Sequence, residues 1–149
     1  MVPIKRTLCA LLVLICVVAL LVSCKANQDD PRHSDKLLRE DNPIRSLSGL
    51  YVVTEERFVD NENTRVFHIV IASESDGSEY VSDVTFRYRD NNYILWADDG
   101  TDILWAISGD TGIYILKHDN GFWKEERYSE NQDLPVPELL LELNLSYWR

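Results

Sequence analysis

The sequence has no cysteine after Cys24, and this absence limits the chemistry open to the rest of the chain. All three cysteines (Cys9, Cys16 and Cys24) lie within the first 24 of 149 residues. The chain that follows therefore has no internal disulfide bond, thiolate zinc site or cysteine nucleophile. It also lacks a helical histidine pair, a glycine-rich phosphate loop and a Gly-x-Ser-x-Gly elbow. We therefore expect no catalytic residues, no metal and no cofactor.

Basic residues are also few. The chain has 15 Lys and Arg against 25 Asp and Glu, a formal net charge of -10. Nucleic-acid binding needs a surface that neutralises phosphates, so we expect no nucleic-acid partner. With 45% hydrophobic and 27% charged residues, the composition is that of a folded chain with enough material for one domain.

The N-terminal segment has the layout of an export signal. Lys5 and Arg6 precede an uncharged run of 17 residues, 7–23, which matches the basic and apolar regions of such signals. The run ends in Leu21-Val22-Ser23-Cys24, which resembles the lipobox of bacterial lipoprotein precursors. The resemblance implies diacylglyceryl transfer to the Cys24 thiol, cleavage before Cys24 and acylation of the new amino terminus. An uncleaved transmembrane helix is the alternative, because 17 apolar residues lie at the lower limit for spanning a bilayer.

The resemblance also implies a location for the mature protein. The covalent lipid would hold it at a membrane of the cell envelope. Lys25 follows the cysteine, and in a Gram-negative host the sorting pattern of this class implies transfer to the outer membrane, facing the periplasm. Removal of residues 1–23 would remove two bases and no acid, so the exported chain would be more acidic than its precursor.

The composition divides the rest of the chain into a tether and a domain. Residues 24–46, which begin with the lipidated Cys24, are rich in polar residues and contain few aliphatic side chains, which is typical of a flexible tether. From residue 47 to residue 149, alternating apolar and polar residues predict a small β domain.

Turn residues separate this domain into about seven strands. Asn, Asp and Gly occur at each of six breaks and tolerate the backbone of tight reversals. Short connections predict antiparallel neighbours, and therefore a meander that closes as a small barrel or folds as a sandwich. The expected strands are residues 49–58, 65–73, 79–89, 92–97, 103–108, 112–118 and 122–128.

The C-terminal segment, residues 134–149, fits two structures. Leucines alternate as in a strand, but Val136, Leu140 and Leu143 also fall on one helical stripe. Pro137 followed by Glu138 is a favourable helix start. We favour a short helix that closes one end of the sheet; an eighth strand is the alternative.

Three short motifs suggest chemistry but have simpler interpretations. Residues 110–112 (Asp-Thr-Gly) match the catalytic triplet of aspartic proteases, but occur once, inside a predicted turn. His68 lies on an apolar strand face, where we expect a buried neutral imidazole with a hydrogen-bond partner. Three acids near one turn lack the spacing of a calcium loop, so we expect solvated turn residues; they are Asp98, Asp99 and Asp102.

The combination of aromatic and acidic residues suggests protein binding. All 15 aromatic residues follow the apolar segment, and five of them lie on consecutive predicted strands: Trp96, Trp105, Tyr114, Trp123 and Tyr128. Such rings among acids could form a partner-binding patch that attracts a basic protein; the alternative is that they fill the core. We therefore expect a lipid-anchored, non-enzymatic protein that binds a macromolecule, for example a basic lysozyme or toxin that it neutralises. A structural or assembly accessory of an envelope complex is the second hypothesis.

Overall fold

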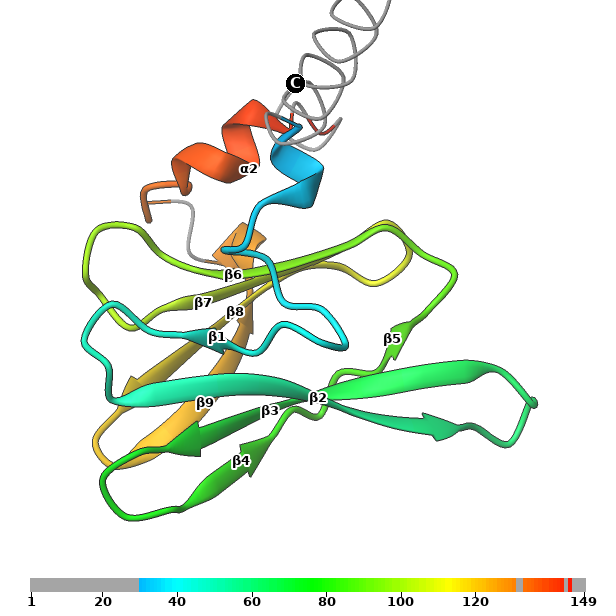
Figure 1. The fold of residues 1–149 in the computed structure, drawn as a ribbon, viewed down its shortest axis with the longest axis horizontal. Helices are drawn as coiled ribbons and strands as arrows, with labels where there is room; N and C mark the ends of the chain where they lie inside the picture. Colours follow the sequence, from blue (N-terminus) through cyan, green and yellow to red (C-terminus); the bar gives the residue numbers. More distant parts are fainter. Residues whose placement is uncertain (1–29, 131–132, 144, 146–149) are drawn as a thin grey trace, which may run out of the picture. The chain divides into compact units, whose positions relative to one another are not determined.

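The computed structural model describes residues 30–130, 133–143 and 145 (Figure 1). The predicted signal peptide and Cys24 lie outside these residues. The chain divides into two compact units, Met1–Ser34 and Asp35–Arg149. In the first unit, Asp30 caps a single 3-10 turn, η1 (Pro31–His33), by accepting a hydrogen bond from the backbone N of Arg32.

The second unit begins before the predicted boundary at residue 47. Leu37, Leu38 and Ile44 lie in the region expected to be tether, but all three are buried. The backbone N of Leu38 donates to the carbonyl O of Ile94 at 2.8 Å. Residues 35–46 therefore belong to the folded unit, because their few apolar side chains find partners in its core.

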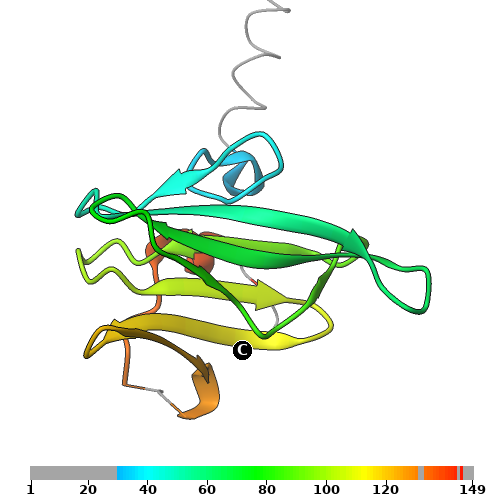
Figure 2. The ribbon, with the colours of Figure 1, turned by 90° about the horizontal axis from the view of Figure 1, so that it is seen from below.

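Two antiparallel sheets form this unit (Figures 1 and 2). Sheet 1 contains β1 (Ile44–Arg45), β2 (Tyr51–Val59), β3 (Arg65–Ser73), β4 (Glu79–Val81) and β5 (Phe86–Arg87). Its order is β1-β2-β3-β4, and β5 also pairs with β3. Sheet 2 has the order β6-β7-β8-β9, with β6 (Asn92–Trp96), β7 (Leu104–Ser108), β8 (Gly112–Asp119) and β9 (Phe122–Arg127). In Figure 2 the β2–β3 hairpin extends beyond the other strands.

The structure confirms the predicted mainly-β fold and its consecutive antiparallel strands. The sheets face each other as a sandwich, not as a closed barrel. The strand expected at residues 79–89 is interrupted, and forms β4 and β5. At the interruption, the Oγ of buried Ser82 accepts a hydrogen bond from Ile69 N at 3.0 Å and donates to Val84 O at 3.0 Å. A side chain thus replaces part of the regular backbone hydrogen-bond ladder between the strands. The alternation of apolar and polar residues in the sequence does not reveal this replacement.

The core between the sheets is formed by alternate residues of the inner strands. Val53, Ile69 and Phe86 of sheet 1 are fully buried against Leu104 and Leu116 of sheet 2. Because successive residues of a strand point to opposite faces, the intervening residues face away from this core.

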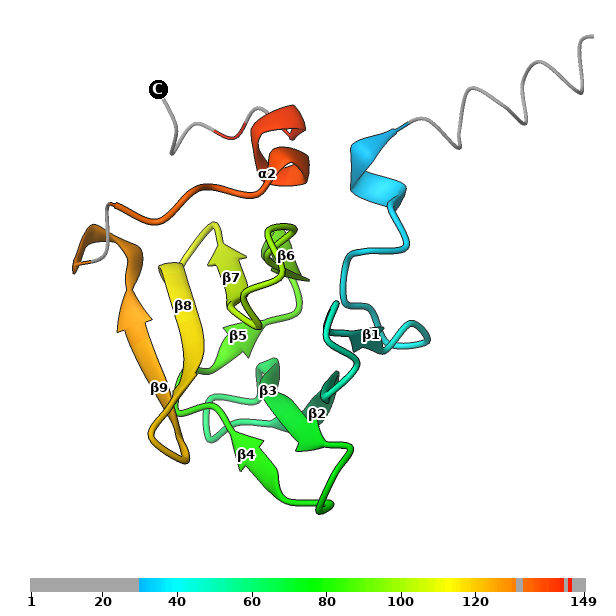
Figure 3. The ribbon, with the colours of Figure 1, turned by 90° about the vertical axis from the view of Figure 1, so that its left-hand side faces the viewer.

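Sheet 2 is covered on its other face as well. Trp105, Ile107 and Ile115 point away from sheet 1 and pack with Leu139 and Leu140. The latter two belong to α2 (Glu138–Glu142), which lies over sheet 2 in Figure 3. Within the described part of the C-terminal segment, residues 138–142 therefore form the short helix that we favoured, but it covers a face of sheet 2 and does not close one end of the sheet. Among residues 30–130, 133–143 and 145, no helix is long and apolar enough to cross a bilayer.

Candidate binding surface at one end of the sandwich

The five aromatic residues that the sequence suggests for partner binding do not form one exposed patch. Trp96 and Trp105 are buried, with exposed fractions of 8% and 1%. Trp96, Tyr114 and Trp123 pack in the core between the sheets, whereas Trp105 and Tyr128 pack on the opposite face of sheet 2. The two groups are separated because side chains of one sheet alternate between its faces, and here both faces are covered.

The rings between the sheets form an aromatic cluster at one end of the sandwich. Tyr51 of β2 is central, with ring centroids 6.3 Å from Trp96, 5.0 Å from Trp123 and 5.8 Å from His118. Tyr80 of β4 extends the cluster, 6.2 Å from Trp123. These contacts join β2 and β4 of sheet 1 to β6, β8 and β9 of sheet 2, and so fix the two sheets at this end.

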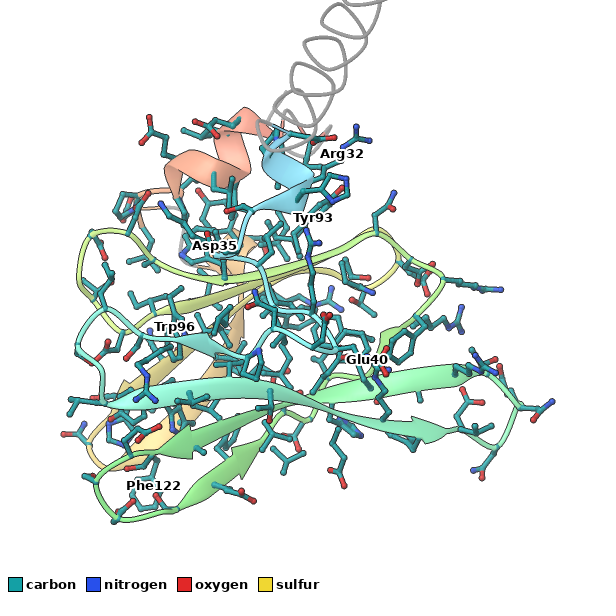
Figure 4. The ribbon with its side chains drawn as sticks, viewed as in Figure 1. Arg32, Asp35, Glu40, Tyr93, Trp96 and Phe122 are labelled. Atoms are coloured by element: carbon teal, nitrogen blue, oxygen red, sulfur yellow. The ribbon has the colours of Figure 1, made fainter. Side chains whose placement is uncertain are left out.

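Four chain reversals surround this cluster, and we call them the loop end: residues 45–51, 73–79, 97–103 and 117–124. They meet because Tyr51 starts β2 beside Ser73 at the end of β3, and the rings of Tyr51 and Trp96 contact each other across the sheets. Within these residues, three large apolar side chains are exposed: Leu47 by 66%, Leu50 by 48% and Phe122 by 74%. In Figure 4, Trp96 lies within the sandwich and Phe122 projects from the β8–β9 turn.

The loop end is strongly acidic. It contains seven acidic residues and three basic ones. The bases already have partners: Arg45 pairs with Glu74 at 3.0 Å, Lys124 pairs with Asp119, and Lys117 pairs with Glu126 of β9 at 2.8 Å. Most carboxylates of this surface are therefore not neutralised by a neighbouring base; the seven acids are Glu74, Asp76, Glu79, Asp98, Asp99, Asp102 and Asp119.

Several of these carboxylates are fixed in the ionised form by the turns they close. The backbone N and Oγ of Ser78 donate to Asp76 and lower its pKa to about 2. The Oγ1 and backbone N of Thr101 donate to Asp99 at 2.6 and 3.0 Å, and lower the pKa of that carboxyl. Hydrogen bonds to the charged form favour ionisation. The negative charge of the loop end therefore persists well below neutral pH.

A cleft of about 490 Å³ opens at the loop end, and we call it the Asp102 cleft. Its lining combines two rings, Tyr51 and His118, with charged and small side chains from β8 and the β6–β7 loop. Oδ1 of Asp102 is buried and has no hydrogen-bond partner. The other lining residues are Thr101, Ile103, Lys117 and Asp119.

The other motifs have structural positions. Asp110 lies in the β7–β8 turn and pairs with Arg87 at 3.1 Å. His68 stacks on Phe58, with ring centroids 4.8 Å apart. It is half-buried, and its buried Nδ1 has no hydrogen-bond partner. The expected hydrogen-bond partner is therefore not found at this nitrogen, although Glu56 lies directly opposite His68 on the neighbouring strand.

The three acids near the β6–β7 turn serve different roles. Oδ2 of Asp98 accepts a hydrogen bond from the backbone N of Glu138 at 3.0 Å, at the start of α2. Asp99 closes its own turn, and Asp102 lines the cleft. In the part of the chain that the structure describes, no three His, Cys, Asp or Glu side chains are grouped to hold a metal ion.

The exposed apolar residues of the loop end were missed by reasoning from strand periodicity alone. Leu47 and Leu50 flank Ser48-Gly49, and Phe122 follows Asn120-Gly121. Turns lie on the surface, so large apolar residues beside these turn signals could have been predicted as exposed.

Comparison of the chain with protein-family models, with curated proteins and with solved structures gave no match.

Proposed function

We propose that this chain is a non-enzymatic binding protein of the bacterial cell envelope, and that it captures a basic protein on its loop end. One observation carries the proposal: three exposed large apolar side chains share this end with seven acidic residues. An apolar centre with a polar rim is the usual anatomy of a protein interface.

Charge and apolar contact have separate roles in this proposal. The acidic residues attract a basic partner over distance and raise the association rate. Leu47, Leu50 and Phe122 then lose contact with water when the partner docks, which slows dissociation. Neutralisation of an incoming basic lysozyme or toxin at the membrane is the task that best fits this arrangement.

The proposed location depends on Cys24. Lipid on its thiol would hold the protein at a membrane, and Lys25 would direct it to the periplasmic face of the outer membrane in a Gram-negative host. Capture at the membrane would concentrate the protein where basic external proteins enter.

Binding to a basic protein and its charge-neutralised form tests the proposal. Full-length protein in non-ionic detergent would be immobilised and exposed to hen lysozyme at 50 and 300 mM salt, and to the same lysozyme with acetylated lysines. We expect binding that weakens about tenfold or more with salt and is lost on acetylation. Binding that does not respond to salt, or no binding to several basic proteins, would contradict the proposal.

The outer face of sheet 1 favours a second candidate function. Val52, Val70 and Val81 share this face, and none of them belongs to either core cluster. An apolar sheet face of this kind suits an assembly or structural accessory of an envelope complex. Such an accessory would bind its partner with little response to salt or to neutralisation of the loop-end acids, which separates it from the capture function.

A further inference from the structure

We infer that the Asp102 cleft binds one cationic side chain of the captured protein, the ammonium of a lysine or the guanidinium of an arginine. This inference rests on the proposed function and adds to it a specific contact. It derives from the charges, the ring faces and the shape of the cleft.

The charges of the cleft leave one carboxylate without a counterion. Three charged side chains line it: Asp102, Lys117 and Asp119. Lys117 Nζ is paired with Glu126 at 2.8 Å, and Asp119 is paired with Lys124. Within the described ranges Asp102 makes no ion pair, and its Oδ1 has no hydrogen-bond donor. Asp102 is half-buried and its Oδ1 is closed to solvent, so a ligand in the cleft would reach this carboxylate through its other oxygen. A partly desolvated carboxylate without a counterion favours a donor that brings positive charge.

The two aromatic rings that line the cleft supply the second component of a cation-binding site. Tyr51 is half-buried and His118 is exposed; they come from different sheets, with ring centroids 5.8 Å apart and planes at 43°. The negative face of an aromatic ring attracts a cation that lies over it, and desolvation strengthens this attraction. Aromatic faces beside a carboxylate are the combination by which proteins hold ammonium and guanidinium groups.

The same residues disfavour other ligands. The one base that lines the cleft, Lys117, is already paired with Glu126, so an anion would meet the uncompensated Asp102. In the described part of the chain no group of three metal-ligating side chains includes Asp102. The volume of about 490 Å³ accommodates a long flexible side chain.

A lysine peptide tests the inference directly. Full-length protein in non-ionic detergent would be titrated by calorimetry with acetyl-(Lys-Ala)5-amide, with an arginine version, and with the lysine peptide acetylated at every Nε. We expect the first two to bind, the tighter of them identifying the preferred side chain, and the acetylated peptide to bind at least about tenfold more weakly.

Two isosteric variants locate the contact. Asp102→Asn removes the cleft charge with little change in shape, and we expect peptide affinity to fall about tenfold. Asp99→Asn is the matched control, because it removes the same charge from the same loop but outside the cleft. For this variant we expect peptide affinity to change by less than about twofold. If Asp102→Asn lowers the melting temperature, the variant Thr101→Lys would be tested in its place. Thr101 is exposed, and a lysine at this position would repel the peptide from the cleft.

The results that would contradict this inference differ from those that would refute the proposed function. Equal effects of Asp102→Asn and Asp99→Asn, no effect of Thr101→Lys, or no peptide binding to the wild-type protein would overturn the inference. Salt-sensitive binding of lysozyme could persist in each of these cases. Loss of lysozyme binding to the wild-type protein would instead refute the proposed function.

Discussion

The ring of Tyr51 on β2 packs edge-on against the indole of Trp123 on β9, with centroids 5.0 Å apart and planes at 79°. This contact joins sheet 1 to sheet 2 at the loop end, where no backbone hydrogen bond of the regular ladders connects the two sheets. An edge-to-face arrangement places the positive edge of one ring on the negative face of the other. The loop end is thus held in place by rings and not by a covalent link.

Removal of this contact should destabilise the fold. We expect Trp123→Ala to lower the free energy of unfolding by about 2–4 kcal/mol, because it removes a large, partly buried ring and leaves Tyr51 unsupported. Urea denaturation followed by circular dichroism would measure the change. The neighbouring Phe122→Ala is the control: Phe122 is 74% exposed, so its loss should cost less than about 0.5 kcal/mol. Equal losses for both variants would show that the Tyr51–Trp123 contact has no special role.

A carboxylate near the same contact should make stability depend on pH. Glu125 of β9 accepts hydrogen bonds from the Tyr80 hydroxyl and the backbone N of Asp83, both at 3.3 Å. Burial raises the pKa of Glu125 above its ordinary value of 4.5. The folded protein therefore binds a proton at this group more readily than the unfolded chain, so the ionised group disfavours the fold at neutral pH. This unfavourable contribution decreases as the pH falls through the raised pKa.

The variant Glu125→Gln tests whether the charge of Glu125 lowers the stability of the fold at neutral pH. It removes the desolvated charge but keeps an acceptor for Tyr80, so we expect its melting temperature at pH 7 to equal or exceed that of the wild-type protein. The difference between the two proteins should shrink as the pH falls from 7 towards 4.5. A variant that is less stable at pH 7, with the deficit vanishing at low pH, would indicate that the charge of Glu125 stabilises the fold.

The lipid anchor is tested by Cys24→Ala. In a bacterial host that lipidates exported precursors, we expect wild-type protein to fractionate with membranes and to carry the mass of the lipid after cleavage before Cys24. The variant should keep an unmodified mass. Intact mass spectrometry measures both. A membrane-bound wild-type product with the mass of the uncleaved, unmodified precursor would support a transmembrane helix instead.

Local sequence predicted most of the strands and little of the candidate site. Turns such as Asn120-Gly121 are specified by a few neighbouring residues, so the strands that flank them could be placed from the sequence. The folding of residues 35–46 could not be predicted in this way, because burial of Leu38 and Ile44 depends on contacts with β2 and with β6, which lies far along the chain. Tertiary packing overrides a composition that is typical of a tether.

The candidate site was harder to predict because exposure depends on what covers each face. Trp96 and Trp105 belong to similar sequences nine residues apart, yet they point to opposite faces of sheet 2. One is buried by sheet 1 and the other by the C-terminal segment. The Asp102 cleft depends in addition on Tyr51 of the other sheet, which no local pattern places beside His118.

The central claim is that the acidic loop end captures a basic protein, and the association rate of hen lysozyme with matched charge variants tests it most directly. One variant neutralises two loop-end acids, Asp76→Asn with Glu79→Gln; the other neutralises two acids in and near the β2–β3 turn, Glu56→Gln with Glu62→Gln. At low salt we predict that the loop-end variant associates about fivefold more slowly than wild-type protein, and that the hairpin variant changes by less than about twofold. Equal rates for the two variants would contradict the claim.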